Sequence, residues 1–354
     1  MEDFQFLPES ARSDIKVSAA LSQAAALGLA PLDAQLLLLH ALGKHASDRA
    51  WVLAHDLDTL QKSVINAFNA LVQRRLQGEP VAYLIGRKEF FGLDLFVDQR
   101  VLVPRPDTET LVEWALAVLD SLAARAVTGD GLAEVDSRLA GANNRLAEVD
   151  SRLAEVDDGP AVLDDGPAVG SSSPAALLFA LDLGTGSGAV ALAIKHSRPA
   201  VQMHATDFSA AALAVAQGNA NRLNLDVQFS QGTWLNGLRD LRNLPDSHPH
   251  YHLIVSNPPY IAAGDLHLAA LAHEPLQALT SGADGLDDIR AIISQAPSNL
   301  QGGGWLLLEH GYDQAARVRA LLQHAGFDAV QSRRDLGDIE RCSGGRWTGP
   351  HISP

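Results

Sequence analysis

From Ala175 onward, short apolar runs alternate with helical patterns, and few folds accommodate that order. The apolar runs are ALLFALDLG, VQMHATD, DVQFSQG, YHLIVSN and GGWLLLEHG. The helical patterns between them are Ser187–Ser197, Ser209–Leu223, Leu286–Asn299 and Tyr312–His324. Helix-length connections between buried strands are typical of parallel pairing. This part of the chain therefore predicts a parallel sheet with helices on both faces.

Two further strand-like segments, DAVQSRRD and ERCSGGRW, follow the last helical pattern. The link between them is short, and a short link permits only antiparallel pairing. Together with the apolar runs above, they predict an α/β domain built on a seven-stranded mixed sheet.

The N-terminal part of the chain shows a different pattern of apolar residues. Residues 14–77 carry apolar side chains at three- and four-residue spacing, with Pro31 suited to a helix start and Gly43 to a stop. EFFGLDLFVDQRVLVPRP then predicts a strand pair, and a helix resumes with Asp107 or Thr108 as its cap. The predicted domains are a helical domain at 1–88, a β-hairpin linker at 89–106 and an α/β domain at 107–354.

A repetitive segment at about residues 125–175 interrupts the α/β domain. LAEVDS occurs at Leu132 and again at Leu146, and DDGPAV is also repeated. The repeats place leucines on one heptad position, which a coiled-coil-like pairing would use. The segment is short and is interrupted by GANN, so we favour a low-complexity surface insertion without a catalytic role.

Composition and charge exclude several classes of protein. The 354 residues carry a net charge of −15 without a basic stripe, which argues against nucleic acid as the main partner. The densest apolar run, LLLLHAL, is far shorter than the ~20 residues of a membrane-spanning helix. The chain has one cysteine, Cys342, and MEDFQFLPES lacks the basic start and apolar block that a secretory signal would show. We expect a cytoplasmic protein with no membrane association and no disulfide framework.

A glycine-rich turn, DLGTGSG, follows the first strand of the sheet and opens a helix. Gly184, Gly186 and Gly188 let the backbone turn sharply and leave room for a ligand beside Thr185 and Ser187. Alone, the turn is also compatible with a tight strand-to-helix connection that binds nothing. The third glycine comes one residue earlier than in the dinucleotide fingerprint, which favours another nucleoside ligand over a pyrophosphate.

Two further positions fit a nucleoside lying over this turn. Asp207 ends the next strand, where its carboxylate can accept hydrogen bonds from both ribose hydroxyls; the alternative is a cap for the helix near Ser209. Trp234 follows the third strand and can stack on an adenine face; the alternative is ordinary core packing. Together with the glycine turn, these residues favour S-adenosylmethionine over NAD as the cofactor.

The motif Asn257, Pro258, Pro259 and Tyr260 follows the fourth strand directly. Asn257 offers a carbonyl acceptor, and the prolines keep the turn rigid because they fix φ and lack N–H groups. A planar –NH2 group can donate one hydrogen to Asn257 and one to the Pro258 carbonyl, with Tyr260 packed over its plane. Both bonds strengthen as the nitrogen attacks a sulfonium methyl group, so no metal or strong base is required.

A histidine-rich stretch, SHPHYH, precedes that strand. His248, His250 and His252 alternate, but no cysteine or carboxylate completes a recognisable set of ligands, so we predict no metal site. His40 and His45 in the helical region are interpreted as surface or packing residues.

NPPY after a DxGxGxG turn resembles the amino-methyltransferases that modify adenine in DNA, guanine in RNA or glutamine in protein. The wider sequence is similar to one branch of them, the peptide chain release factor N5-glutamine methyltransferase (HemK/PrmC) family. The matching blocks are GRKEFFGLDLFVDQRVLVPRPDTE, VSNPPYI, EPLQAL and LLLEHG. The similarity covers nearly the whole chain outside residues 125–175.

This resemblance implies a Rossmann-like class I S-adenosylmethionine-dependent methyltransferase, with the small helical domain holding the partner. The implied substrate is the glutamine amide nitrogen (N5) in the Gly-Gly-Gln motif of bacterial class 1 release factors. By position, the implied cofactor contacts are Gly184, Thr185, Gly186, Ser187, Gly188, Asp207, Trp234 and Asn257, and the glutamine contacts are Asn257 to Tyr260.

Two other functions use the same residues. A nucleic-acid methyltransferase acting on adenine N6 or guanine N2 would place a base in the same clamp, but we find neither a basic groove nor a target-recognition segment for it. A release-factor-binding scaffold without transfer activity would not need the intact motifs. Arg105 and Glu109 lie in a matching block, and the sequence assigns them no definite role.

Overall fold

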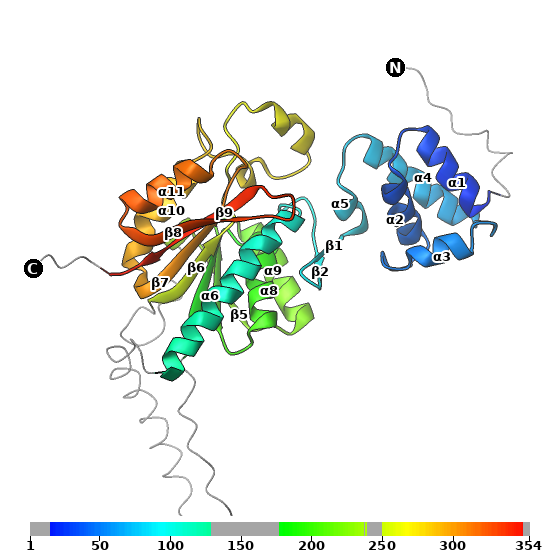
Figure 1. Cartoon of the computed structure of the whole chain (residues 1–354). Helices are drawn as coiled ribbons and strands as arrows, with labels where there is room; N and C mark the ends of the chain where they lie inside the picture. The colour runs from blue at the N-terminus through cyan, green and yellow to red at the C-terminus, as the bar shows by residue number, and fades with distance from the viewer. Residues whose placement is uncertain (1–14, 129–176, 237, 239–249, 350–354) are drawn as a thin grey trace, which may run out of the picture.

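The computed structural model describes residues 15–128, 177–236, 238 and 250–349 (Figure 1). The repeats within residues 129–173 and the predicted role of His248 lie outside these ranges and stay predictions. Within the described ranges, no helix combines the length and the apolar character that crossing a membrane requires.

Helices make up the described N-terminal region, as predicted (Figure 1). They are α1 (Val17–Ala26), α2 (Pro31–Ala41), α3 (Arg49–Ala54), α4 (Lys62–Leu76) and α5 (Val81–Ile85). Their apolar faces meet in one core that contains Leu37, Leu38 and Phe68, each at most 1% exposed. Pro31 begins α2 because its missing N–H needs no partner in the first helical turn. The helices α3 and α5 have only 6 and 5 residues, too few to display a helical period.

A strand pair follows the helices, and it is shorter than the predicted linker. β1 (Arg87–Phe90) pairs antiparallel with β2 (Leu93–Phe96). Residues 97–105 continue without strand pairing in the described part of the chain. Pro104 has no N–H to offer a ladder, and the Val103 N–H donates instead to the Glu274 carboxylate at 3.1 Å.

The predicted seven-stranded mixed sheet is present. Its strands are β3 (Phe179–Leu183), β4 (Gln202–Asp207), β5 (Val227–Gln231), β6 (Tyr251–Ser256), β7 (Leu300–Glu309), β8 (Phe327–Arg334) and β9 (Glu340–Trp347). Their spatial order is β5-β4-β3-β6-β7-β9-β8. The first five strands run parallel, and β9 is antiparallel to β7 and to β8, as the short link between β8 and β9 predicts.

Helices cover both faces of the sheet (Figure 1). α6 (Glu109–Thr128), α8 (Ala189–Ser197) and α9 (Ala210–Leu223) contribute to one core, and α10 (Asp287–Gln295) and α11 (Ala315–His324) to the other. Neighbouring residues of β6 divide between the two: Leu253 and Val255 face the first core and Ile254 the second. Burial on both faces explains why this strand reads as a continuous apolar run.

Candidate functional site

The candidate site lies where the carboxyl ends of the parallel strands meet. The chain runs outward from β3 to β5 and returns at β6 on the other side of β3, so the strand order reverses there. Such a reversal leaves a crevice above the strand ends. A cavity of about 280 Å³ lies in this crevice. Its lining includes the predicted residues Gly184, Thr185, Gly186, Ser187, Asp207, Trp234, Asn257 and Pro259.

The glycine turn between β3 and α8 adopts the sharply turning backbone conformation that its glycines predict. Gly184, Gly186 and Gly188 have φ of +70°, +56° and +84°, a region that side chains rarely permit. Close packing adds a second reason at two positions. A Cβ on Gly184 would lie 3.3 Å from the Trp234 ring, and a Cβ on Gly188 would lie 3.0 Å from Leu192.

Asp182, at the start of the same motif, stabilises the glycine turn through hydrogen bonds. Its Oδ2 accepts hydrogen bonds from the Thr185 hydroxyl (2.6 Å) and from the Ala191 N–H (3.2 Å). Burial raises the pKa of Asp182 to about 7, although the Thr185 hydrogen bond opposes that rise. The carboxyl group therefore ties the end of β3 to the first turn of α8.

Asp207 ends β4 and faces the glycine turn. Its Oδ2 accepts from the Gly186 N–H (2.9 Å) and its Oδ1 from the Ser209 N–H (2.8 Å). The cap of α9 is the Ser209 side chain, which accepts from the Ala212 N–H at 3.2 Å. An ionised carboxylate has about four acceptor positions, so about two remain for a ligand in the cavity. Burial raises the pKa of Asp207.

Trp234 packs against the core and also borders the cavity, so stacking on an adenine ring stays a prediction. The residue packs against the core on the α10 and α11 face of the sheet, and its ring lies over Gly184. It also lines the cavity. Core packing thus holds the ring in place while part of it stays available to a ligand.

The NPPY motif leaves β6 beside the glycine turn. The Ser256 hydroxyl donates to the Leu183 carbonyl at 2.7 Å, which joins the ends of β6 and β3. Asn257 Nδ2 donates to the Thr108 hydroxyl at 3.2 Å. That contact directs the donor end of the Asn257 amide toward η2 (Pro106–Thr108) and leaves Oδ1 as the end available to a ligand.

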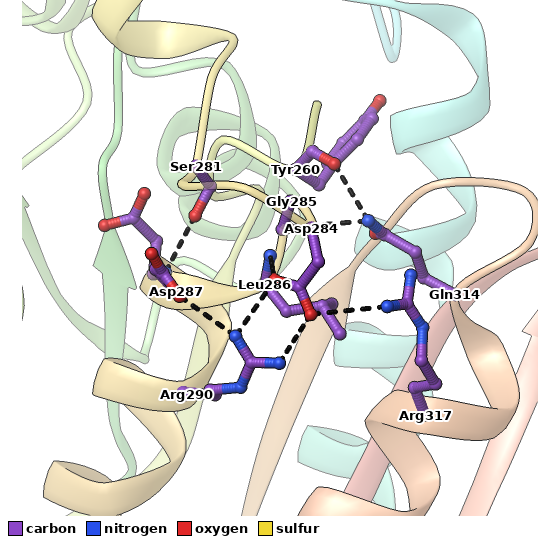
Figure 2. A network of polar contacts seen from close by, with 10 residues as sticks. Tyr260, Ser281, Asp284, Gly285, Leu286, Asp287, Arg290, Gln314 and Arg317 are labelled. Carbon is purple, nitrogen blue, oxygen red and sulfur yellow. Dashed lines mark hydrogen bonds and ion pairs between the residues drawn. The ribbon is translucent and has the colours of Figure 1, made fainter. Parts of the chain in front are cut away.

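Tyr260 is held from two sides. Its hydroxyl donates to Glu309 Oε1 at 3.4 Å. Its carbonyl accepts from Gln314 Nε2 at 2.9 Å, as Figure 2 shows. Gln314 is buried and also accepts from the Gly311 N–H at 2.9 Å. Burial raises the pKa of the Tyr260 phenol. Gly188, Pro258 and Tyr260 are not among the described residues that line the cavity, so packing of Tyr260 over a bound amide stays a prediction.

A network of charged side chains supports the loop before α10 (Figure 2). Asp284 pairs with Arg290 at 2.6 Å and with Arg317 at 3.3 Å. The Arg290 hydrogen bond lowers the pKa of Asp284 to about 2. The next residue, Gly285, has φ of +75°, and a Cβ there would lie 2.3 Å from the Tyr260 carbonyl oxygen. The loop therefore packs directly against the backbone of the motif.

Arg105 and Glu109 make contacts that hold the linker in place. Arg105 forms an ion pair with Glu274, whose side chain is 3% exposed and also accepts the Val103 N–H. Glu109 Oε1 accepts from the Phe91 N–H in the hairpin turn at 3.1 Å. These bonds join the segment after the hairpin to the loop that follows NPPY, and the hairpin to α6.

Thr108, Glu309 and Gln314 form hydrogen bonds with the NPPY motif that the sequence analysis did not predict. Glu309 ends β7, so a polar residue after a buried strand was the available signal, as it was for Asp207. Thr108 and Gln314 contact the motif from segments that are distant in the sequence, and no local sequence pattern predicts such contacts.

The predicted interpretation of the histidines can be checked for most of them. His252 Nδ1 accepts from the Phe179 N–H at 3.1 Å, and burial lowers the pKa of His252 to about 4. His40 and His45 are exposed. In the described part of the chain, no group of three or more His, Cys, Asp or Glu side chains could hold a metal ion.

Comparison with known proteins assigns a family. A model of the PrmC N-terminal domain matches residues 15–86, and a model of the methyltransferase small domain matches residues 174–283. The release factor glutamine methyltransferase of Xylella fastidiosa (strain Temecula1) is 41% identical over 333 residues, which cover 93% of this chain and 98% of that protein. The Bordetella pertussis (strain Tohama I) protein of the same name is 42% identical over 320 residues, covering 90% and 95%. The chain belongs to the release factor glutamine methyltransferase family.

The family membership confirms the resemblance carried by the sequence motifs. Together with the strand order of the sheet, it identifies the larger unit as the predicted Rossmann-like class I methyltransferase fold. The helical region at residues 15–86 corresponds to the N-terminal domain of the family.

Proposed function

We propose that this enzyme transfers a methyl group from S-adenosylmethionine to the side-chain amide nitrogen of the glutamine in the Gly-Gly-Gln motif of bacterial class 1 release factors. The observation that carries the proposal is the position of Asn257, at the carboxyl end of β6 and on the lining of the same cavity as the glycine turn. Relatives of 35–42% identity named release factor glutamine methyltransferase support the same activity.

The lining of the cavity offers a backbone turn, a hydrogen-bond acceptor and an aromatic ring that S-adenosylmethionine would use. Gly186 lines it, and an added Cβ on this residue would meet no atom within 4 Å. The Asp207 carboxylate has acceptor positions left for ribose hydroxyls, and Trp234 offers an aromatic edge. The cofactor supplies the electrophilic methyl group. Gly184 to Gly188, Asp207, Trp234 and Asn257 are the residues that we propose to hold it.

The glutamine amide is held by Asn257 and the Pro258 carbonyl in this proposal. Thr108 already occupies the donor end of the Asn257 side chain, so the Asn257 carbonyl oxygen can accept one amide hydrogen. Pro258 and Pro259 offer no N–H that could compete for that oxygen. As the amide nitrogen gains positive character, both hydrogen bonds strengthen, and a charge-assisted bond of this kind is worth ~1.5–3 kcal/mol in total.

The partner in this proposal is a release factor, which the helical domain at 1–88 would hold. His273 Nε2 lies 3.0 Å from the Gln77 carbonyl oxygen, so the loop after NPPY contacts the end of the helical region. A partner bound to the helices would therefore lie beside the loop that lines the cavity through Pro275, Gln277 and Ala278. We expect the reaction to take place in the cytoplasm, without direct contact to nucleic acid.

Radiolabelled methyl transfer to purified release factor tests the proposal. Label is expected on the native factor and is expected to vanish when the glutamine of its Gly-Gly-Gln motif is replaced. Asn257→Ala should abolish transfer, whereas Asn299→Ala, in the turn before β7, should leave it intact. Mass spectrometry then locates the added methyl group. Label on DNA or RNA with none on the release factor would instead support the nucleic-acid alternative.

A further inference from the structure

A buried carboxyl group stands behind the NPPY motif with unused hydrogen-bonding capacity. Glu309 ends β7, and the residue is 1% exposed. Its Oε1 accepts the Tyr260 hydroxyl, but its Oε2 is buried without a hydrogen-bond partner among the described residues. Leaving a charged acceptor unsatisfied in a protein interior is costly, so such an atom calls for an explanation.

Thr108 connects this carboxyl group to Asn257. Its hydroxyl accepts from Asn257 Nδ2 at 3.2 Å, and its interaction with the Glu309 carboxyl opposes the rise of that group's pKa. A threonine hydroxyl has one hydrogen and can rotate to donate it. While Asn257 uses an acceptor position of that oxygen, the hydrogen is free to point to the carboxylate.

An ionised carboxylate can only accept hydrogen bonds, and this gives the series of side chains a direction. With Glu309 as acceptor, Thr108 donates to Glu309 and accepts from the Asn257 –NH2 group. The Asn257 carbonyl oxygen is then the end left for the substrate. If Glu309 were a donor, Thr108 could donate to Asn257 Oδ1, and the Asn257 amide would turn its –NH2 group toward the cavity. A glutamine amide would then meet a donor where it needs an acceptor.

We propose that Glu309 is a positioning residue that acts through Thr108 to keep the carbonyl oxygen of Asn257 facing the substrate amide. This inference rests on the proposed function, because it concerns which end of Asn257 meets the glutamine. Glu309 itself does not line the cavity in the described part of the chain, so it exchanges no proton with the substrate.

The charges around Glu309 determine when it can act as an acceptor. Asp107 on η2 raises the pKa of Glu309 and Arg341 on β9 lowers it. The two residues also form an ion pair with each other at 3.2 Å. Tyr260 and Cys342 are the other titratable neighbours. Burial dominates and raises the pKa of Glu309 to about 7. Only above this pH is the carboxyl group predominantly an acceptor.

Four variants test the direction of the hydrogen bonds. Glu309→Gln keeps the shape and adds a donor, Thr108→Val keeps the shape and removes the hydroxyl, and Thr108→Ser keeps the hydroxyl. Glu340→Gln, a half-buried carboxylate on β9 that pairs with Arg319, is the matched control. The assay measures kcat and KM for release factor from pH 6 to 9, together with S-adenosylmethionine affinity.

Glu309→Gln and Thr108→Val are expected to lower kcat by roughly 10- to 100-fold, since they misdirect one hydrogen bond made in the transition state. KM and cofactor affinity should change less than threefold, and Thr108→Ser and Glu340→Gln should retain kcat within about threefold. The wild-type kcat should rise with pH around 7, and this limb should be missing in Glu309→Gln.

Three results would overturn the inference. The first is a Glu309→Gln enzyme with wild-type kcat and an unchanged pH limb. The second is a Thr108→Ser enzyme as impaired as Thr108→Val, which would assign the loss to packing. The third is a wild-type enzyme that methylates no release factor, which would also refute the proposed function. An active wild type beside an unimpaired Glu309→Gln refutes the inference alone.

Discussion

Substitution of Gly285 by alanine should damage catalysis far more than stability alone would account for. Gly285 has φ of +75° and packs against the motif, with an added Cβ 2.3 Å from the Tyr260 carbonyl oxygen and 2.7 Å from Gln314 Nε2. Ordinary contact begins at 3.4 Å, so backbone on one side or the other has to move by roughly 1 Å. The Gln314 hydrogen bond that fixes Tyr260 lies directly in the path of that movement.

The size of the effect has two parts. An alanine in this backbone region costs ~1–2 kcal/mol, and disruption of the Gln314 bond adds ~1 kcal/mol or more. The free energy of unfolding should therefore fall by about 2–4 kcal/mol. Because a misplacement of about 1 Å can reduce the rate ~10²-fold, kcat should fall by about that factor.

Gly264→Ala is the matched control for Gly285→Ala. Gly264 lies in the loop after NPPY with φ of +89°, and an added Cβ would meet no atom within 4 Å. It should lose ~1–2 kcal/mol of stability from backbone strain and keep kcat within a few fold. Urea unfolding and initial rates of methyl transfer measure the two quantities. Equal kcat values for the two alanine variants would refute the argument that Gly285 transmits its effect through Tyr260.

Three further predictions concern other parts of the site. Arg105→Ala should lower the free energy of unfolding by about 1–3 kcal/mol, because it leaves the buried Glu274 carboxylate without its ion pair. Arg198→Ala removes an exposed ion pair and should lower it by at most about 1 kcal/mol. Urea unfolding compares the two variants. Asp207→Asn should weaken S-adenosylmethionine binding by roughly 10- to 100-fold in equilibrium dialysis, and an unchanged Kd would remove Asp207 from the cofactor site. Burial raises the pKa of Glu309 from 4.5 to about 7, so the folded protein retains a proton that the unfolded chain releases. The wild type should accordingly lose up to about 3 kcal/mol relative to Glu309→Gln between pH 4.5 and pH 7, and a stability difference independent of pH would contradict this.

Much of the α/β unit follows from local sequence patterns. Strands buried on both faces read as continuous apolar runs, and helix-length gaps between them are typical of parallel crossovers. The short link between β8 and β9 likewise permits only antiparallel pairing. Gly184 and Asn257 directly follow a strand and Asp207 ends one. Because the carboxyl ends of parallel strands meet at one edge, the sequence alone predicts that these residues converge.

The tertiary structure decides what those residues do once they converge. Asp207 and Ser209 are both plausible caps in sequence, and only the hydrogen bond to Ala212 assigns the cap to Ser209. Asn257 could turn either end of its amide to the cavity, and it is Thr108, 149 positions away, that selects one. Glu309 and Gln314 hold Tyr260 through contacts across 49 and 54 positions. The spacing of apolar residues along one segment predicts which face of that segment is buried. The direction of a side chain's hydrogen bond depends instead on which side chain from a distant segment packs beside it.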